Sequence, residues 1–417
     1  MSALTQPGPM ESLPAFRIRN AQGVAWKLVF LIATVGVCLV FLSLLLTTLN
    51  STFGVVAYEN AREPESLLPG RESLQEMTRD ELLGLLRENL STGMLRRLDS
   101  DKPLTERGEN ELREIVQERI VEPEIVRSWT LLQSFLAQDA IAAHAQAHPD
   151  HDLAFRSWLS ADFLTSHQSS RPEDAGVRAA LLGTIWIVLL AVVFAFPVGV
   201  LTAIYMEEYA RRNIFTTLVS LNIQNLAGVP SVIYGLLGLA VFVRLMEPVT
   251  GGAFLGRPEA MTAAGRTILS GGLTLGLLIL PLVIINTQEA FRSIPPGYRQ
   301  ACLSVGAQKW RVIMQRLLPF SFDRLLTVVI LAISRAIGET TPLIVIGAAT
   351  FIVADPAGVF SKFTALPVQI YFWSTRPQEE FQKIAAAAIV ILLLLSFGMN
   401  IVLILLRENV RQAKRSL

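Results

Sequence analysis

The sequence has few of the residues on which soluble enzymes depend. Charged residues fill 17% of its 417 positions, against roughly 25% in ordinary soluble domains. It contains no Gly-x4-Gly-Lys-Ser/Thr phosphate-binding loop, so the chain cannot hydrolyse ATP by itself. All four histidines lie between residues 144 and 167, which leaves the rest of the chain without the commonest general base. We therefore expect a protein that is not an enzyme, with no catalytic residue and no cofactor.

Cysteine is scarce, and acidic charge is confined to one stretch of the chain. The two cysteines, Cys38 and Cys302, stand too far apart in sequence and context to suggest a disulfide. Of the 35 acidic residues, 23 lie between Tyr58 and Gly176, where only 13 of the 36 basic residues fall. The sequence therefore divides into an acidic segment and a larger part that is apolar and basic.

Long apolar runs dominate that larger part. Hydrophobic residues make up 52% of the chain, and the mean hydropathy is +0.46. A membrane-spanning helix needs about 20 apolar residues, and the first run is too long for the core of a signal peptide, so we interpret it as a retained anchor. The pattern predicts an all-α membrane protein with six transmembrane helices, at residues 26–49, 177–205, 215–246, 267–286, 325–353 and 385–406.

The basic residues predict the orientation of these helices. Six crossings bring both termini to one side, and the basic clusters of the membrane part all fall on that side, which the positive-inside rule assigns to the cytoplasm. We expect a multi-pass protein of the bacterial plasma membrane with cytoplasmic tails at 1–25 and 407–417. The segment 287–323 is then a cytoplasmic loop within a core at 177–406, and residues 50–176 form an extracytoplasmic insertion.

The insertion is predicted to be a soluble and mostly helical domain. Thr78 and Glu81 have the spacing of a capping box at the start of an amphipathic helix, and residues 122–148 resemble a second helix that begins at Pro123. The sequence "HAQAHPDH" permits a metal site, but a polar helix end is the preferred interpretation because the spacing matches no known zinc motif. The three histidines concerned are His144, His148 and His151. The insertion either contacts a binding protein or packs on the membrane domain, and we favour packing.

The third apolar run is interrupted by polar residues, glycine and proline in the sequence "SLNIQNLAGVPSVIYG". A polar, broken helix at membrane depth is tolerated where it faces protein or a water-lined route. The alternative is a kinked helix that only packs against its neighbours. We expect this segment to line a substrate pathway through Asn222, Gln224, Asn225 and Ser231.

One pair of opposite charges lies inside the fifth run. Arg335 and Glu339 are four residues apart, on one face of a helix. A lone charge at the bilayer centre costs about 3 kcal/mol, so such residues face the interior of a bundle. The pair is either a structural salt bridge or part of the substrate route, and we prefer the second interpretation.

A basic segment, "GYRQACLSVGAQKWRVIMQRLLP", separates the fourth and fifth runs. Pro296 and Gly297 start a short helix, Gly306 breaks it, and a second helix is expected to stop at Leu318 and Pro319. An apolar centre within a basic rim is typical of a protein contact; an interfacial hairpin on anionic lipid is the alternative. The centre consists of Leu303, Val305, Ala307 and Trp310, and the rim of Arg299, Lys309, Arg311 and Arg316.

This hairpin resembles the EAA loop of binding-protein-dependent ABC permeases. Gln300, Ala301 and Cys302 stand at the Glu-Ala-Ala positions, Gly306 at the glycine, and the ending Leu318 and Pro319 also match. Gln300 replaces an acidic residue and Arg316 an apolar one. The resemblance implies the ABC importer permease fold, with a hairpin that couples to an ATPase through Gln300, Ala301, Leu303, Val305, Gly306, Ala307, Trp310 and Pro319.

Three more stretches resemble the phosphate transporter permeases, of the PstA type more than the PstC type. They read "AGVPSVIYGLLGLAVFV", "LPLVIINTQEAFRSIPPGYR" and "SRAIGETTPLIVIGAATF". The resemblance implies an ATP-driven phosphate importer in which this chain works with a PstC-like second permease, two copies of an ATPase and an extracytoplasmic phosphate-binding protein. Three alternatives remain: a permease for another oxyanion such as sulfate or molybdate, an ion-driven transporter, and a receptor or scaffold that acts through the insertion.

Overall fold

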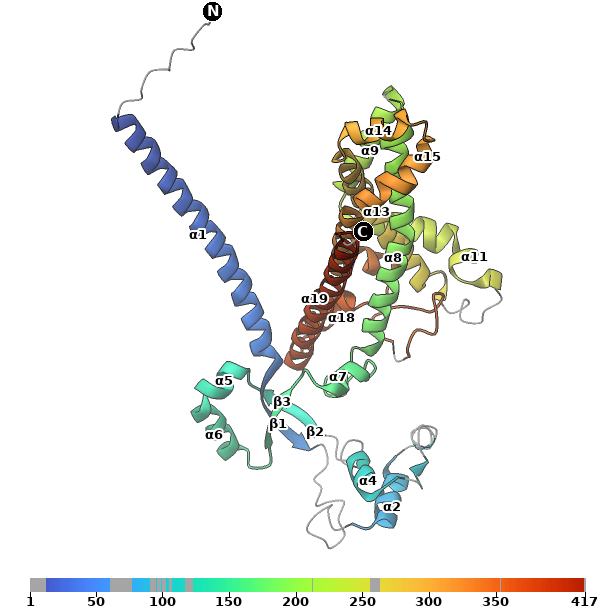
Figure 1. The fold of residues 1–417 in the computed structure, drawn as a ribbon. Helices are drawn as coiled ribbons and strands as arrows, with labels where there is room; N and C mark the ends of the chain where they lie inside the picture. The colour runs from blue at the N-terminus through green and yellow to red at the C-terminus, as the bar shows by residue number, and fades with distance from the viewer. Residues whose placement is uncertain are drawn as a thin grey trace, which may run out of the picture.

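A bundle of long helices carries a small domain at one of its ends (Figure 1). The computed structural model describes residues 13–60, 77–90, 107–116, 123–211, 213–255, 263–352 and 354–415, together with residues 95, 99, 103 and 104. Within these residues, five helices are long and apolar enough to cross a membrane, and a sixth crossing is available if one bent pair counts as a single span. The helical fold class expected from the sequence is confirmed.

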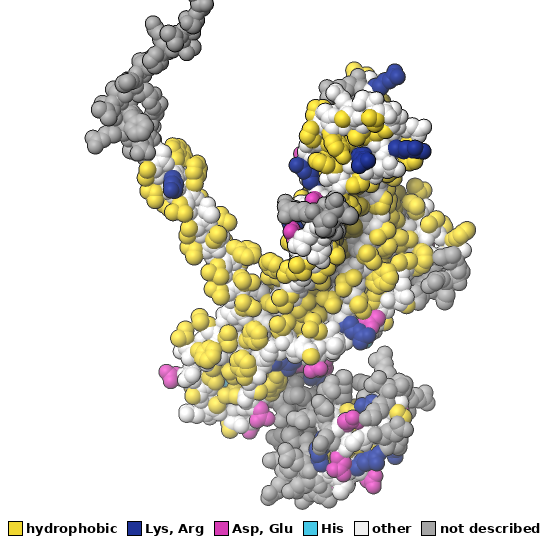
Figure 2. Space-filling view, in the orientation of Figure 1, with side chains coloured by type: hydrophobic (Ala, Val, Ile, Leu, Met, Phe, Trp, Pro, Cys, Tyr) yellow, Lys and Arg dark blue, Asp and Glu magenta, His cyan; other side chains and the backbone are white. Residues whose placement is uncertain are grey.

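Five spans follow the apolar runs. They are α1 (Leu13–Thr52), α8 (Arg178–Ile204), α13 (Ile268–Arg292), α16 (Leu318–Gly338) and α19 (Glu379–Arg415). Apolar side chains cover α1 and the middle of the bundle, while Lys and Arg gather at the upper end of the core in Figure 2. Such an apolar belt below a basic end is what a bilayer requires of a spanning protein.

The third apolar run is not a straight helix. It forms α9 (Ile214–Ala227), α10 (Ser231–Gly238) and the π-helical segment η6 (Leu239–Leu245), and the two halves are bent by 104°. Pro230 stands at the break, directly before α10. Proline has no backbone N–H to donate and disfavours helical backbone in the residue before it, so the helix ends there.

The bent pair carries the chain across the bundle once, because α8 and α13 run in the same direction. At their starts, Arg178 forms an ion pair with Asp355 at 2.6 Å, and the backbone N–H of Ile268 donates to Ser361 in the same loop. At their ends, Glu207 just beyond α8 pairs with Arg292 of α13 at 2.6 Å. Since both helices start at one end and finish at the other, the segment between them must return the chain once.

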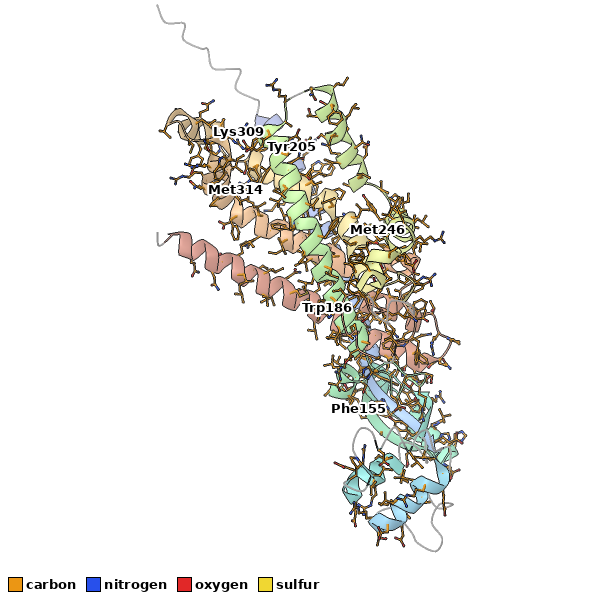
Figure 3. All side chains as sticks on the ribbon, turned by 90° about the vertical axis from the view of Figure 1, so that its right-hand side faces the viewer. Phe155, Trp186, Tyr205, Met246, Lys309 and Met314 are labelled. Atoms are coloured by element: carbon orange, nitrogen blue, oxygen red, sulfur yellow. The ribbon has the colours of Figure 1, made fainter. Side chains whose placement is uncertain are left out.

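The remaining elements of the core are short. After η6 come α11 (Glu247–Thr250) and a 3-10 turn (Ala253–Leu255). Beyond α13 lie α14 (Pro296–Ser304) and α15 (Lys309–Val312), and beyond α16 lie α17 (Thr341–Ile346) and α18 (Leu366–Ser374). Figure 3 shows Lys309 and Tyr205 near one end of the bundle, Trp186 further along, and Phe155 toward the other end.

The insertion contains a sheet that the sequence analysis did not predict. Strands β1 (Phe53–Asn60), β2 (Pro123–Ser128) and β3 (Asp152–Ser157) form an antiparallel sheet in the order β2-β1-β3. The expected helix at 122–148 is therefore wrong in its first part, since Pro123 opens a strand. Helix begins only at α5 (Leu131–Leu136) and continues with α6 (Gln138–Ala147). β2 is an edge strand, where proline costs no ladder hydrogen bond to a further strand.

The other predicted helix of the insertion is present. α2 (Arg79–Asn89) begins with the capping box of Thr78 and Glu81, and the backbone N–H of Thr78 donates to the Glu81 carboxylate at 2.8 Å. It packs on α4 (Glu109–Val116) through Leu82 and Leu86, both fully buried. The sequence pattern favours a helix over residues 77–98, but α2 ends at Asn89, and most of residues 91–98 lie outside the described residues.

The sheet and the membrane bundle share one apolar core. Three buried side chains of the insertion pack with residues at the start of α8, in α18 and at the start of α19. They are Val56 of β1, Trp158 just after β3, and Phe163 of α7 (Ala161–Thr165). A second, larger cluster lies among α8, α13, α16 and α17. The sheet is therefore packed directly on the bundle.

Candidate functional site

Two short helices and a glycine bend form the basic hairpin. α14 starts at Pro296 as predicted, and Gly306 has a φ of +79°, a conformation that glycine adopts without strain. The expected stop at Leu318 and Pro319 is wrong. Instead, a π-helical turn (Ile313–Leu317) joins α15 to α16, with Pro319 in the first turn of α16. A π turn loosens the backbone ladder just where proline cannot donate, so the helix continues past it.

The tip of the hairpin exposes apolar side chains. Val305 is 81% exposed, and Leu303 and Trp310 are also exposed. The indole N–H of Trp310 donates to the side chain of Gln308 at 2.8 Å, which holds the ring at the surface. Ala307 instead packs partly against the cluster beneath the hairpin. The exposed centre, which we call the apolar tip, therefore consists of Leu303, Val305 and Trp310.

Arg299 does not belong to the basic rim. Its guanidinium points inward, where it donates to Glu208 at 3.0 Å and to the backbone carbonyls of Ile294 and Phe291. The rim is formed by the exposed side chains of Lys309, Arg311 and Arg316, and Gln300 is also exposed. The guanidinium turns inward because the carboxylate of Glu208, held at the end of α8, offers it a charged partner.

One ion pair anchors the hairpin to the bundle, and a second joins the two spans beside it. Both use the π-helical turn Tyr205–Tyr209 after α8: Glu208 binds Arg299 of the hairpin, and Glu207 binds Arg292 at the end of α13. The sequence analysis missed this arrangement, although adjacent acidic residues in the basic flank "MEEYARRN" were the available signal. Because the hairpin is tied to the ends of α8 and α13, a force on its tip acts on both spans.

Gly306→Val is expected to loosen the hairpin. A β-branched residue in the left-handed region costs about 1–2 kcal/mol, although the space around the added side chain is open. Amide hydrogen exchange across residues 296–317 should therefore accelerate. Gly297→Val is the matched control, since Gly297 also has open space but lies in the first turn of α14. Equal protection in both variants would show that the bend does not depend on glycine.

The charged pair lies where a span ends inside the bundle. Arg335 and Glu339 are 3.7 Å apart, and α16 ends between them, at Gly338. Ser334 donates to Asn400, which lies inside the apolar stretch of α19, so this helix end is at membrane depth. Both side chains retain exposed area, and the space beside Gly338 is open. The charges thus reach a surface of the bundle that another subunit or a substrate can approach.

The polar residues of the broken span lie on its exposed part. Asn222, Gln224 and Asn225 are exposed near the end of α9, and the Asn222 amide donates to the carbonyl of Leu218 within the helix. Ser231 begins α10 and is partly exposed. In the described part of the chain, no hydrogen bond or ion pair of these residues reaches Arg335.

Helix α10 instead packs closely against α17, the short helix that follows the charged pair. A side chain at Gly235 of α10 would lie 2.9 Å from the backbone of Pro342 in α17, and one at Gly238 would meet Thr274 of α13. Glycine at these positions permits a close approach of helix backbones. The two interrupted spans, α9 with α10 and α16 with α17, therefore meet at their breaks.

Three histidine rings of the insertion form a cluster. His144 Nε2 is 3.2 Å from His151 Nδ1, and the rings of His148 and His151 stack with centroids 4.7 Å apart. The pKa of His144 is lowered from its ordinary value. The largest cause is burial, followed by the nearby charges of His148 and Arg127. Among the described residues, no group of three or more potential ligands is arranged to hold a metal ion.

Helix breaks that leave a charged pair inside a membrane bundle are typical of transport proteins. The comparison of sequences identifies the family. Residues 195–413 match the family of binding-protein-dependent transport system inner membrane components, and the chain belongs to it. It is an integral membrane transport subunit and not itself an enzyme, as the sequence analysis expected.

Several similar proteins are named as permease proteins of transport systems. The chain is 27% identical to the probable ABC transporter permease protein YqgI of Bacillus subtilis, over 58% of this chain and 82% of that protein. It is 31% identical to the phosphate transport system permease protein PstA of Mycobacterium leprae, over 55% and 70%. It is 34% identical to the phosphate transport system permease protein PstC 2 of Mycobacterium tuberculosis, over 45% and 61%.

Solved structures with some similarity also come from ABC transporters. A chain of the MetNI methionine ABC transporter has a TM-score of 0.40 at 16% identity, covering 56% of this chain and 95% of that chain. A chain of a bacterial alginate ABC transporter has a TM-score of 0.43 at 15% identity, covering 64% and 87%.

Proposed function

We propose that this chain is a membrane subunit of an ATP-driven phosphate importer and forms part of its translocation pathway. The observation that carries the proposal is the anchored hairpin with its exposed apolar tip, in a chain of the binding-protein-dependent family. Support for phosphate comes from relatives named for phosphate transport, at 28–34% identity. The partners are then a second permease subunit of the PstC type, two ATPase subunits and an extracytoplasmic phosphate-binding protein.

The hairpin is the element that couples transport to ATP. Leu303, Val305 and Trp310 present apolar area within a basic rim, the composition of a contact between proteins. Closure of the ATPase subunits would pull on this hairpin, and the ion pairs of Glu207 and Glu208 would pass the movement to α8 and α13. The bundle then switches between outward and inward access, which is gating without covalent chemistry in this chain.

Arg335 and Glu339 belong to the substrate route in this proposal. A phosphate ion crossing a medium of low dielectric needs a cation nearby, and the Arg335 guanidinium keeps exposed area at membrane depth. Glu339 holds the guanidinium and tempers its attraction for the anion. Asn222, Gln224, Asn225 and Ser231 line the route on the broken third span.

Uptake of radiolabelled phosphate by cells that carry the complete transport system tests the substrate. Unlabelled phosphate is expected to compete, whereas sulfate and molybdate are not. Competition by sulfate or molybdate instead of phosphate would assign the chain to an importer of another oxyanion. Uptake that persists when the ATPase partner is deleted would exclude ATP as the energy source.

The orientation is testable with single cysteines, after Cys38 and Cys302 are replaced. We place the termini and the hairpin in the cytoplasm and the insertion outside, because the basic residues gather at the hairpin end (Figure 2). A cysteine at Glu109 of α4 should react with a membrane-impermeant maleimide in intact cells, and one at Gln412 of α19 only after permeabilisation. The reverse pattern would overturn the orientation.

A further inference from the structure

Lys383 is a buried cation whose ammonium group makes no hydrogen bond in the described structure, although the carboxylates of Glu379 and Glu380 lie near enough to act on its charge. It lies one turn into α19, and its residue exposes only 7% of its surface. Removing an ammonium group from water without a compensating partner costs several kcal/mol. A ligand that brings a negative charge to this position would offset that cost.

Lys383 is one of the residues that line a notch of about 550 Å³ between the end of α1 and the start of α19. Hydroxyl groups line the same notch, and each of the three on α1 now donates to a carbonyl oxygen one turn earlier in its helix. Such a hydroxyl can rotate toward an anion, since the carbonyl keeps its bond within the helix. Glu379 adds one carboxylate. The lining hydroxyls are those of Thr47, Thr48, Ser51 and Thr130.

The notch lies at the boundary of the membrane. α1 and α19 approach each other where α1 leaves its apolar stretch (Figure 1). The side chain of Asn50 there accepts a hydrogen bond from the backbone N–H of Leu132, which fixes the start of α5 at this level. Three apolar side chains of α5, Leu132, Phe135 and Leu136, are nevertheless 61%, 69% and 78% exposed. Exposed apolar residues beside a spanning helix that is itself unburied fit a lipid environment.

We propose that the notch binds the headgroup of a zwitterionic phospholipid, with Lys383 on the phosphate group and Glu379 on the amine. The lining offers one cation and one carboxylate four residues apart on the same helix face, which matches a headgroup that carries both charges. Free inorganic phosphate fits less well, because the carboxylate of Glu379 would repel an ion that carries only negative charge. The acyl chains then lie against α1 and α5.

Thermal unfolding of the purified full-length chain tests the proposal. Dihexanoyl-phosphatidylethanolamine is expected to raise the Tm of the wild type in a saturable manner. Lys383→Met should lower the apparent affinity for this lipid at least about tenfold, since a charge-assisted contact is lost. The variant should fold, because methionine fills similar space and removes an unpaired charge. Lys362→Met is the matched control, an exposed lysine in the loop that pairs with the start of α13, and should behave as wild type.

Two further arms identify the ligand. Glu379→Gln is expected to reduce the preference for phosphatidylethanolamine over phosphatidylglycerol, which has no amine. Inorganic phosphate should leave the Tm unchanged. Equal stabilisation by inorganic phosphate, unchanged lipid affinity in Lys383→Met, or no stabilisation of the wild type by any lipid would each overturn the proposal.

Discussion

Val305→Asp is expected to abolish phosphate uptake and to remove the ATPase subunits from the purified complex, while the chain itself remains folded in the membrane. Val305 is 81% exposed, so the substitution costs the isolated subunit little. In the assembled transporter the same side chain would be buried, and an unpaired carboxylate at the centre of an interface costs about 2–4 kcal/mol or more. Binding should therefore weaken at least about thirtyfold, as measured by co-purification of the ATPase.

Val305→Leu is the matched control for this prediction. It keeps the apolar character at the same exposed position, so uptake and ATPase binding should remain. Normal uptake in Val305→Asp would remove the docking role of the apolar tip. Loss of the chain from the membrane in that variant would instead show that Val305 supports the fold.

Arg335→Gln is expected to reduce phosphate uptake by about two orders of magnitude, with the complex still assembled and still hydrolysing ATP. An anion that loses its cationic partner at membrane depth faces a barrier higher by about 3 kcal/mol. Arg335 keeps exposed area and lies 3.7 Å from Glu339, so its loss leaves one partly exposed carboxylate rather than a deeply buried one. Radiolabelled uptake and ATPase activity, measured on the same preparation, check the result.

Arg324→Gln serves as the control, since Arg324 is exposed on the same helix nearer the hairpin and should tolerate the change. Glu339→Gln should impair uptake less, by slowing release of phosphate. A different set of results would show that Arg335 and Glu339 form only a structural salt bridge. In that case Arg335→Gln would prevent assembly, and the double change of Arg335 and Glu339 to Gln would restore both assembly and uptake.

Local chemistry explains which features of the hairpin and the insertion could be predicted. The start of α14 at Pro296, the bend at Gly306 and the capping box of Thr78 depend on residues adjacent in sequence, and each is confirmed. The stop at Pro319 was wrong because a π turn before it absorbs the missing backbone donor. The strand at Pro123 was missed because its pairing partner, β1, lies more than 60 residues earlier in the chain.

The direction in which a long side chain points is the clearest limit of sequence reasoning. Arg299 and Arg316 both carry a guanidinium on the hairpin, yet only Arg299 turns inward, because Glu208 at the end of a distant helix lies within reach. In the same way, the sequence places Lys383 at the start of an apolar run, where lysines commonly face water. Its burial follows from the approach of α1 to α19.

The sequence by itself determined that the chain enters the membrane, where its long apolar helices lie and which end of the bundle is basic. These properties follow from the length of apolar runs and the distribution of charge, because the bilayer acts on each segment separately. The tertiary structure alone decided the meeting of the two interrupted spans and the burial of Lys383. These depend on contacts between segments far apart in the chain, where close backbone approach at Gly235 and Gly238 selects one packing.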